Sequence, residues 1–334
     1  MHRYTSAMKP PHDNRSGGQN RPPFSSPPRS GTGPGRHGPR SHEHGSQDPG
    51  QRGSSSPAGK PQAKPWDGRQ QRQGGPQRHS QHGHSHNRRG PDTPRGAVWL
   101  YGLHAVAAAL ANPARRLRRL ILSEEAEATL TQRLAPPWSV QPERSERSRL
   151  DQLLGRDIAH QGAALLADLL PTPSLQHVLE RTGPLIVLDH VTDPRNVGAI
   201  LRAADAFGAA GVITQDRNAP EETGSMAKAA SGALETMPLL RAVNIARTLI
   251  ALKAAQVWVI GLDAKGKSLI GPAHAGRRVA VVLGAEHTGL RRLTRETCDE
   301  IAGFAMRGST GSLNVSAAAA VALYELTRQV EGET

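Results

Sequence analysis

Cysteine, aromatic residues and long hydrophobic runs are all scarce in this chain of 334 residues. The single cysteine, Cys298, excludes an intramolecular disulfide framework. No stretch approaches the ~18 consecutive apolar residues of a membrane span, and the first ten residues lack the apolar core of a secretory signal. These absences predict a soluble cytoplasmic protein with no membrane partner.

Apolar runs are missing above all from residues 1–96, which consist mostly of Gly, Pro, Ser, Gln, His and Arg. This segment carries 16 Lys and Arg against 5 Asp and Glu, and therefore holds 11 of the 13 net positive charges of the chain. We expect a disordered basic tail, because so polar a segment cannot bury enough apolar surface to offset its ordering entropy. The charge favours a polyanionic partner, and a solubilising extension without a partner is the alternative. We predict no metal site at the histidine group His79, His82, His84 and His86, because no Cys or carboxylate accompanies it in an ordered frame.

Residues 97–170 predict a small α/β domain, because strand-like and helix-like segments alternate over this length. Its expected strands are 98–102, 117–122 and 163–167, and its expected helices are 104–111, 124–134 and 148–153. The Pro-Thr-Pro sequence that follows predicts a linker over residues 171–182.

Residues 183–330 predict a second α/β domain built on a mostly parallel sheet. Continuous apolar runs, typical of strands covered on both faces, occupy 185–188, 211–214, 257–262 and 279–283, with a shorter run at 237–240. Expected helices are 196–207, 226–230, 245–255 and 315–329. Asn196 is expected to cap the first of these helices and Gly208 to end it.

Ligands bind parallel sheets where loops leave the carboxyl ends of the strands, which directs attention to loops 189–196, 284–290 and 306–314. After the first loop, Gly198 has no side chain and allows a backbone or a ligand to approach closely. Arg202 can hold a phosphate through two parallel hydrogen bonds. An ordinary surface arginine is the alternative.

The second and third loops combine glycines with a few polar side chains. Glu286 lies between Gly284 and Gly289, in a setting where a cofactor can approach the main chain and a carboxylate can orient a substrate. Ser312 and Asn314 lie beside the expected N-terminus of the last helix, where free N–H groups favour negative charge.

Taken together, the three loops resemble the signature motifs of the SpoU (TrmH) family of the SPOUT methyltransferase superfamily. The resemblance covers about residues 185–326 and includes LDHVTDPRNVG from residue 188, ASGALET from residue 230 and SLNVS from residue 312. Residues 98–170 are similar to the ribosomal-protein-like RNA-binding domain that precedes the catalytic domain in many members.

The resemblance implies a fold, a cofactor and an assembly. The C-terminal chain would form a trefoil knot that holds S-adenosylmethionine, and two subunits of a homodimer would complete the active site. By position, the cofactor residues would be Leu283, Gly284, Phe304, Met306 and Leu313. Relatives commonly have Ile-Pro-Met where this chain reads Phe304-Ala305-Met306, so a proline that pre-organises the backbone is missing.

The resemblance also implies the reaction, which is methylation of a ribose 2′-hydroxyl in RNA, expected at a guanosine of 23S rRNA. Its catalytic residues would be Asn196, Arg202, Glu286, Ser312 and Asn314. The alternatives are a tRNA substrate and a non-catalytic RNA-binding assembly factor. A nicotinamide dehydrogenase is disfavoured, because residues 189–198 lack the G-x-G-x-x-G fingerprint.

Overall fold

The computed structural model describes residues 93–328, except residues 267 and 275. All of these belong to one compact unit. Almost all of the expected basic tail lies outside the described residues, as do His79, His82, His84 and His86.

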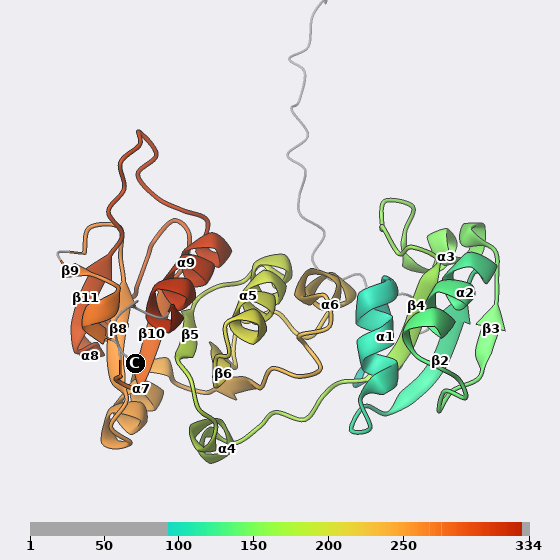
Figure 1. Ribbon diagram of the computed structural model, residues 1–334, viewed down its shortest axis with the longest axis horizontal. Coiled ribbons are helices and arrows are strands. Elements are labelled where there is room, and N and C mark those ends of the chain that lie inside the picture. The colour runs from blue at the N-terminus through green and yellow to red at the C-terminus, as the bar shows by residue number, and fades with distance from the viewer. Residues whose placement is uncertain (1–92, 267, 275, 329–334) are drawn as a thin grey trace, which may run out of the picture. The chain divides into compact units, whose positions relative to one another are not determined.

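The first part of the described chain forms a four-stranded sheet in the order β1-β4-β2-β3. Figure 1 labels β2, β3 and β4 of this sheet. Its strands are β1 (Ala97–Tyr101), β2 (Leu117–Leu122), β3 (Pro142–Arg144) and β4 (Ala163–Asp168), and only the β2–β3 pair is parallel. The three helices are α1 (Leu103–Ala111), α2 (Glu124–Arg133) and α3 (Arg147–Leu154). Because side chains alternate along a strand, Leu100 and Leu165 share a core with α1 and α2, whereas Trp99 and Leu166 pack with Leu150 of α3.

The second part forms a parallel seven-stranded sheet in the order β7-β6-β5-β10-β8-β11-β9, which confirms the expected α/β class. Its strands are β5 (Leu185–Asp189), β6 (Gly211–Gln215), β7 (Leu239–Ala242), β8 (Trp258–Leu262), β9 (Ser268–Leu269), β10 (Val279–Gly284) and β11 (Glu300–Gly303). Every pair of neighbouring strands is parallel. Asp189 at the end of β5 lies opposite Gly284 at the end of the neighbouring β10. The loops after β5 and β10 therefore start side by side.

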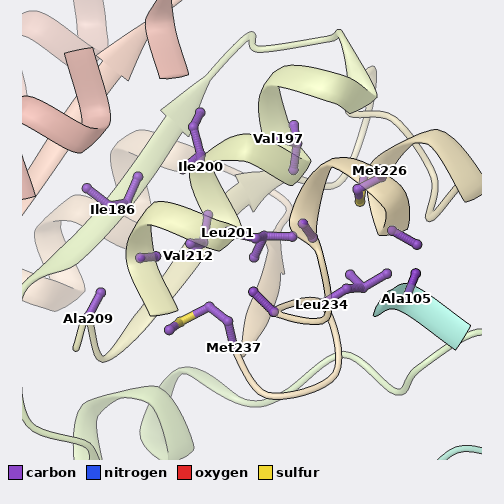
Figure 2. Close-up of a cluster of buried hydrophobic side chains, with 14 of the residues drawn as sticks. Ala105, Ile186, Val197, Ile200, Leu201, Ala209, Val212, Met226, Leu234 and Met237 are labelled. Carbon is purple, nitrogen blue, oxygen red and sulfur yellow. The ribbon is translucent and has the colours of Figure 1, made fainter. Parts of the chain in front are cut away.

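Helices cover both faces of this sheet. They are α4 (Leu175–Glu180), α5 (Pro194–Ala206), α6 (Gly224–Ala230), α7 (Ile245–Ala254), α8 (Arg292–Thr297) and α9 (Val315–Thr327), with a 3-10 turn at Pro272–His274. Ile186 and Val281 pack with α5, α6 and α9, whereas Val187 and Val282 pack with α4 and α7. Figure 2 shows the first of these cores, in which Ala105 of α1 lies beside side chains of the second sheet's helices.

Two expectations about element boundaries were wrong. Asn196 does not cap α5: the helix begins at Pro194, and its N-cap is Asp193, whose carboxylate accepts a hydrogen bond from the Arg195 N–H. The segment 171–182 is not only a linker, because it contains α4, capped by Ser174. The sequence patterns also gave no indication of β3, β9, α8 or β11.

Candidate active site

Three side chains meet at the carboxyl edge of the parallel sheet: Asn196 from the first turn of α5, Glu286 from the loop after β10, and Asn314 from the N-cap of α9. The Asn196 amide donates a hydrogen bond to Glu286 Oε1 at 2.7 Å. The Asn314 amide donates to the same oxygen at 3.0 Å and to Asn196 Oδ1 at 3.2 Å. Glu286 and Asn314 are exposed and Asn196 is half-buried, so the cluster is accessible to a ligand. We call these three residues the amide–carboxylate cluster.

Asn314 is held in place because it also caps α9. Its Oδ1 accepts hydrogen bonds from the Ser316 N–H at 2.9 Å and from the Ser316 hydroxyl at 2.6 Å. Since Oδ1 is the acceptor in both bonds, the Nδ2 donors are left for Glu286 and Asn196. Ser316 therefore positions Asn314, a role that the sequence did not reveal, because a serine in a first helical turn commonly bonds to nearby backbone.

The loop that carries Glu286 is a tight turn whose shape requires its two glycines. Ala285 and Gly289 exchange backbone hydrogen bonds of 2.9 and 3.2 Å, and Gly289 has a positive φ of 64°. A Cβ atom on Gly284 would lie 2.1 Å from the Gly289 carbonyl carbon. The turn thus fixes where the Glu286 side chain emerges.

A buried ion pair anchors the end of the same loop. Asp189, fully buried at the end of β5, accepts a hydrogen bond from the Arg291 backbone N–H at 3.1 Å and lies 2.6 Å from the Arg291 guanidinium. The pairing satisfies a carboxylate that would otherwise be costly to bury. It ties the loop after β10 to β5, and neither residue was identified from the sequence.

Two predicted catalytic residues do not join the cluster within one chain. Arg202 lies on α5 six residues after Asn196, is exposed, and forms no hydrogen bond or ion pair with any residue in the described part of the chain. Ser312 is likewise exposed and forms no hydrogen bond there. The backbone of α6 packs closely against Gly198, and no open space for a ligand lies beside it. A Cβ atom at this position would lie 2.3 Å from the Met226 carbonyl oxygen.

The predicted cofactor residues lie around the loops after β10 and β11. Leu283 is buried and Gly284 is half-buried at the end of β10, and Phe304 packs against the core after β11. Met306 and Leu313 are 38% and 40% exposed. These apolar side chains, together with a glycine main chain, suit an adenine ring, which needs apolar walls and backbone hydrogen-bond partners.

Residues 93–328, without 267 and 275, contain neither a metal-binding cluster nor a helix that could cross a membrane. Over this range, no three His, Cys, Asp or Glu side chains are grouped so that they could hold a metal ion. No helix within the same range combines the length and the apolar character that crossing a membrane requires.

Curated relatives match this chain over almost their whole length. The 23S rRNA (guanosine-2′-O-)-methyltransferase RlmB of Bordetella pertussis is 38% identical over 70% of this chain and 98% of the relative. The protein of the same name from Vibrio cholerae is 40% identical over 69% of this chain and 96% of the relative.

Solved structures share the fold. The SpoU methyltransferase AviRb from Streptomyces viridochromogenes, in complex with AdoMet, is 23% identical with a TM-score of 0.57, over 69% of this chain and 89% of that one. A structure described as an RNA 2′-O ribose methyltransferase is 26% identical with a TM-score of 0.55, over 69% and 87% of the two chains.

Family models match both sheets. Residues 99–173 match the model for RNA 2′-O ribose methyltransferase substrate binding, and residues 183–324 match that of the SpoU rRNA methylase family. This second match includes Asn196, Glu286 and Asn314, the residues that meet in the amide–carboxylate cluster. The chain therefore belongs to the SpoU rRNA methylase family.

Proposed function

We propose that this protein transfers a methyl group from S-adenosylmethionine to the ribose 2′-hydroxyl of a guanosine in 23S rRNA, and does so in the cytoplasm. The relatives whose names give this activity match this chain over nearly their full length. The observation that carries the proposal is the meeting of Asn196, Glu286 and Asn314, which come from three segments far apart in the sequence.

Leu283, Gly284, Phe304, Met306 and Leu313 would hold the cofactor. When bound, S-adenosylmethionine supplies a methyl group on a positively charged sulfur. The apolar side chains would exclude water from that group, and Gly284 would let the main chain approach it. Loss of the proline at Ala305 leaves this loop less pre-organised, so that we expect weaker cofactor binding without a change of cofactor.

The polar residues would align the target nucleotide. Glu286 Oε1 already accepts two amide hydrogen bonds, whereas Oε2 has no donor among the described residues and can orient a ribose hydroxyl. Arg202 would hold the phosphate, and Ser312 would hydrogen-bond within the site. Arg202 is not the general base in this proposal, because its guanidinium stays protonated. Alignment of the hydroxyl with the methyl group contributes ~7–11 kcal/mol in favourable cases.

A homodimer would bring Arg202 to the active site. Arg202 is exposed on α5 and does not reach the cluster of its own chain, so a second copy would supply it. On α9, which packs beside α5, Tyr324 is 52% exposed and Val321 is 39% exposed, as expected of a surface that another subunit covers.

Mixing two inactive variants tests this dimer. Arg202→Ala and Asn314→Ala homodimers should both be inactive. Mixed dimers contain one site in which both residues are intact if Arg202 acts across the interface, so activity should return to roughly half of that of mixed wild-type controls. Activity that stays absent in proven mixed dimers would place Arg202 in its own chain's site.

We further propose that the catalytic domain, residues 183–330, contains a trefoil knot. β11 lies two strands beyond β10 in the sheet, yet the following helix, α9, packs against α5 and β10, so the chain must cross back over β10. Residues 97–170 would form the ribosomal-protein-like RNA-binding domain, connected through residues 171–182. An experimental electron-density trace of residues 284–315 that shows no threading would refute the knot.

The activity itself is tested with purified protein, labelled S-adenosylmethionine, and 23S rRNA and tRNA transcripts. Nuclease digestion and mass spectrometry should show 2′-O-methylguanosine in 23S rRNA only. Methylation of tRNA alone would establish the alternative substrate. Absence of S-adenosylmethionine binding in isothermal titration would instead support a non-catalytic assembly factor.

A further inference from the structure

A cleft of about 320 Å³ lies at the same carboxyl edge of the sheet as the amide–carboxylate cluster. It is bordered by the loops that follow β5, β6, β7 and β10, and its lining includes His190, Gln215, Arg217, Asn244, Arg291 and Leu293. None of the amide–carboxylate cluster lines it, so it is a separate site. Its volume falls at the lower end of the range for small-molecule sites.

Gln215 gives this cleft an unpaired hydrogen-bond donor. The side chain is only 5% exposed, and its Oε1 accepts the His190 backbone N–H at 3.2 Å, which fixes the orientation of the amide. Its Nε2 is buried and has no partner. Buried donors without partners are rare in folded proteins, so this one indicates a missing acceptor.

The rest of the lining also offers donors. Arg217 is exposed and forms no hydrogen bond or ion pair with the described residues. Asn244 Oδ1 is occupied as the cap of α7, which leaves the Nδ2 donors free. No Asp or Glu is among the described lining residues. The cleft therefore favours a ligand that is anionic and rich in acceptors.

Two apolar side chains complete the cleft. Val243 is 83% exposed and Leu293 is 58% exposed, and both line it. Exposed aliphatic side chains beside free donors fit a nucleotide, whose base has an apolar face and an acceptor edge and whose phosphate is anionic.

We infer that this cleft binds one unpaired nucleotide of the RNA, next to the nucleotide that is methylated. Arg217 holds its phosphate, Gln215 Nε2 donates to the acceptor edge of its base, and Val243 and Leu293 contact the face of the base. The inference rests on the proposed function, because it takes the ligand to be the substrate RNA.

Arg217→Ala tests the phosphate contact, with Arg247→Ala as the matched control. Arg247 is also exposed and lies on α7, but it does not line the cleft. In filter binding of a 23S rRNA transcript, Arg217→Ala should bind roughly tenfold more weakly. Its slope of log affinity against log salt should be less steep by about 0.7. Equal behaviour of the two variants would overturn the phosphate assignment.

Gln215→Glu tests the base contact, because it keeps the acceptor for the His190 N–H and replaces the Nε2 donor. We expect the KM for RNA to rise several-fold, with unchanged affinity for S-adenosylmethionine in titration. A wild-type KM would overturn this contact.

Photo-crosslinking with a 23S rRNA transcript that contains 6-thioguanosine shows which residues contact the RNA, and it does not require methyl transfer. Crosslinks should map to residues 215–218 and 291–294. Crosslinks there from a protein that methylates no RNA would support the cleft while refuting the proposed function. Crosslinks confined to other residues would refute the cleft.

Discussion

At the scale of single residues, Asn314 uses one amide both to cap α9 and to bind Glu286. Asn314→Asp separates these roles, because Asp is an equally good N-cap but cannot donate to Glu286. We expect unfolding stability to stay within about 0.5 kcal/mol, since the cap is kept, and kcat to fall by about 10²–10³, as for other lost donors in active sites.

Asn314→Ala is the control for the capping role and should lose about 1 kcal/mol of stability as well as activity. Denaturant unfolding and single-turnover methyl transfer measure the two effects. A fully active Asn314→Asp variant would mean that the amide donors do not matter to the reaction.

Arg202→Lys offers a cleaner test of catalysis, because Arg202 makes no bond within the described chain. Stability should be unchanged within about 0.5 kcal/mol. Methyl transfer should fall at least about tenfold, because lysine keeps the charge but cannot form two parallel hydrogen bonds to a phosphate. Near wild-type turnover with this variant would rule out the two-bond contact.

The sequence could identify Asn196, Glu286 and Asn314 only through the resemblance of their motifs. Their separations of 90 and 28 residues say nothing about contact until the strand order is known. The ion pair between Asp189 and Arg291 was missed for the same reason, although an aspartate that ends a wholly apolar strand is a signal that a cation must lie nearby.

At the scale of elements, strands with continuous apolar runs and capped helices were predictable, and short or mixed segments were not. β2 was predicted to the residue although it contains two arginines, because leucines mark both of its ends. β11 has four residues and starts with Glu300, so neither length nor periodicity distinguishes it from a loop. The start of α5 was misplaced, although Asp193-Pro194 is a standard helix start with proline at the first position.

The crossing of α5 and α6 gives a prediction about packing. Gly198→Ala would place a Cβ atom 2.3 Å from the Met226 carbonyl oxygen and 2.8 Å from Ala229 Cβ, so the helices must separate. We expect a loss of about 1–3 kcal/mol in denaturant unfolding. Gly311→Ala is the control, because its Cβ would meet nothing within 4 Å, and a loss as large in this variant would contradict the packing argument.

At the scale of the whole molecule, the net positive charge is concentrated in residues 1–96. Removing residues 1–96 eliminates 11 of the 13 net positive charges. If this segment binds phosphates, a chain starting at residue 97 should lose RNA affinity at low salt and lose less at high salt, because counterion release drives such binding. Filter binding in 50 and 200 mM salt measures this; equal affinity of the two chains at low salt would support a solubilising role only.

A buried charge cluster connects the two sheets. Arg115, fully buried in the loop before β2, lies 2.5 Å from Glu222 and 2.6 Å from Glu235, both in the catalytic part of the chain. Two carboxylates around one guanidinium leave one excess negative charge. Burial raises the pKa of Glu222 above its usual 4.5, although Arg115 opposes the shift.

The raised pKa fixes how stability depends on pH. Folded chains keep the Glu222 proton over a pH range above 4.5 in which unfolded chains release it, so stability falls as pH rises through that range. Glu222→Gln should remove this fall and leave a neutral Arg115–Glu235 pair, with stability near pH 7 within about 1 kcal/mol of wild type. Arg115→Met should instead lose about 3–5 kcal/mol, because both carboxylates stay buried without a cation. Denaturant unfolding between pH 5 and 8 distinguishes these outcomes, and a stable Arg115→Met variant would show that the cluster does not hold the two sheets together.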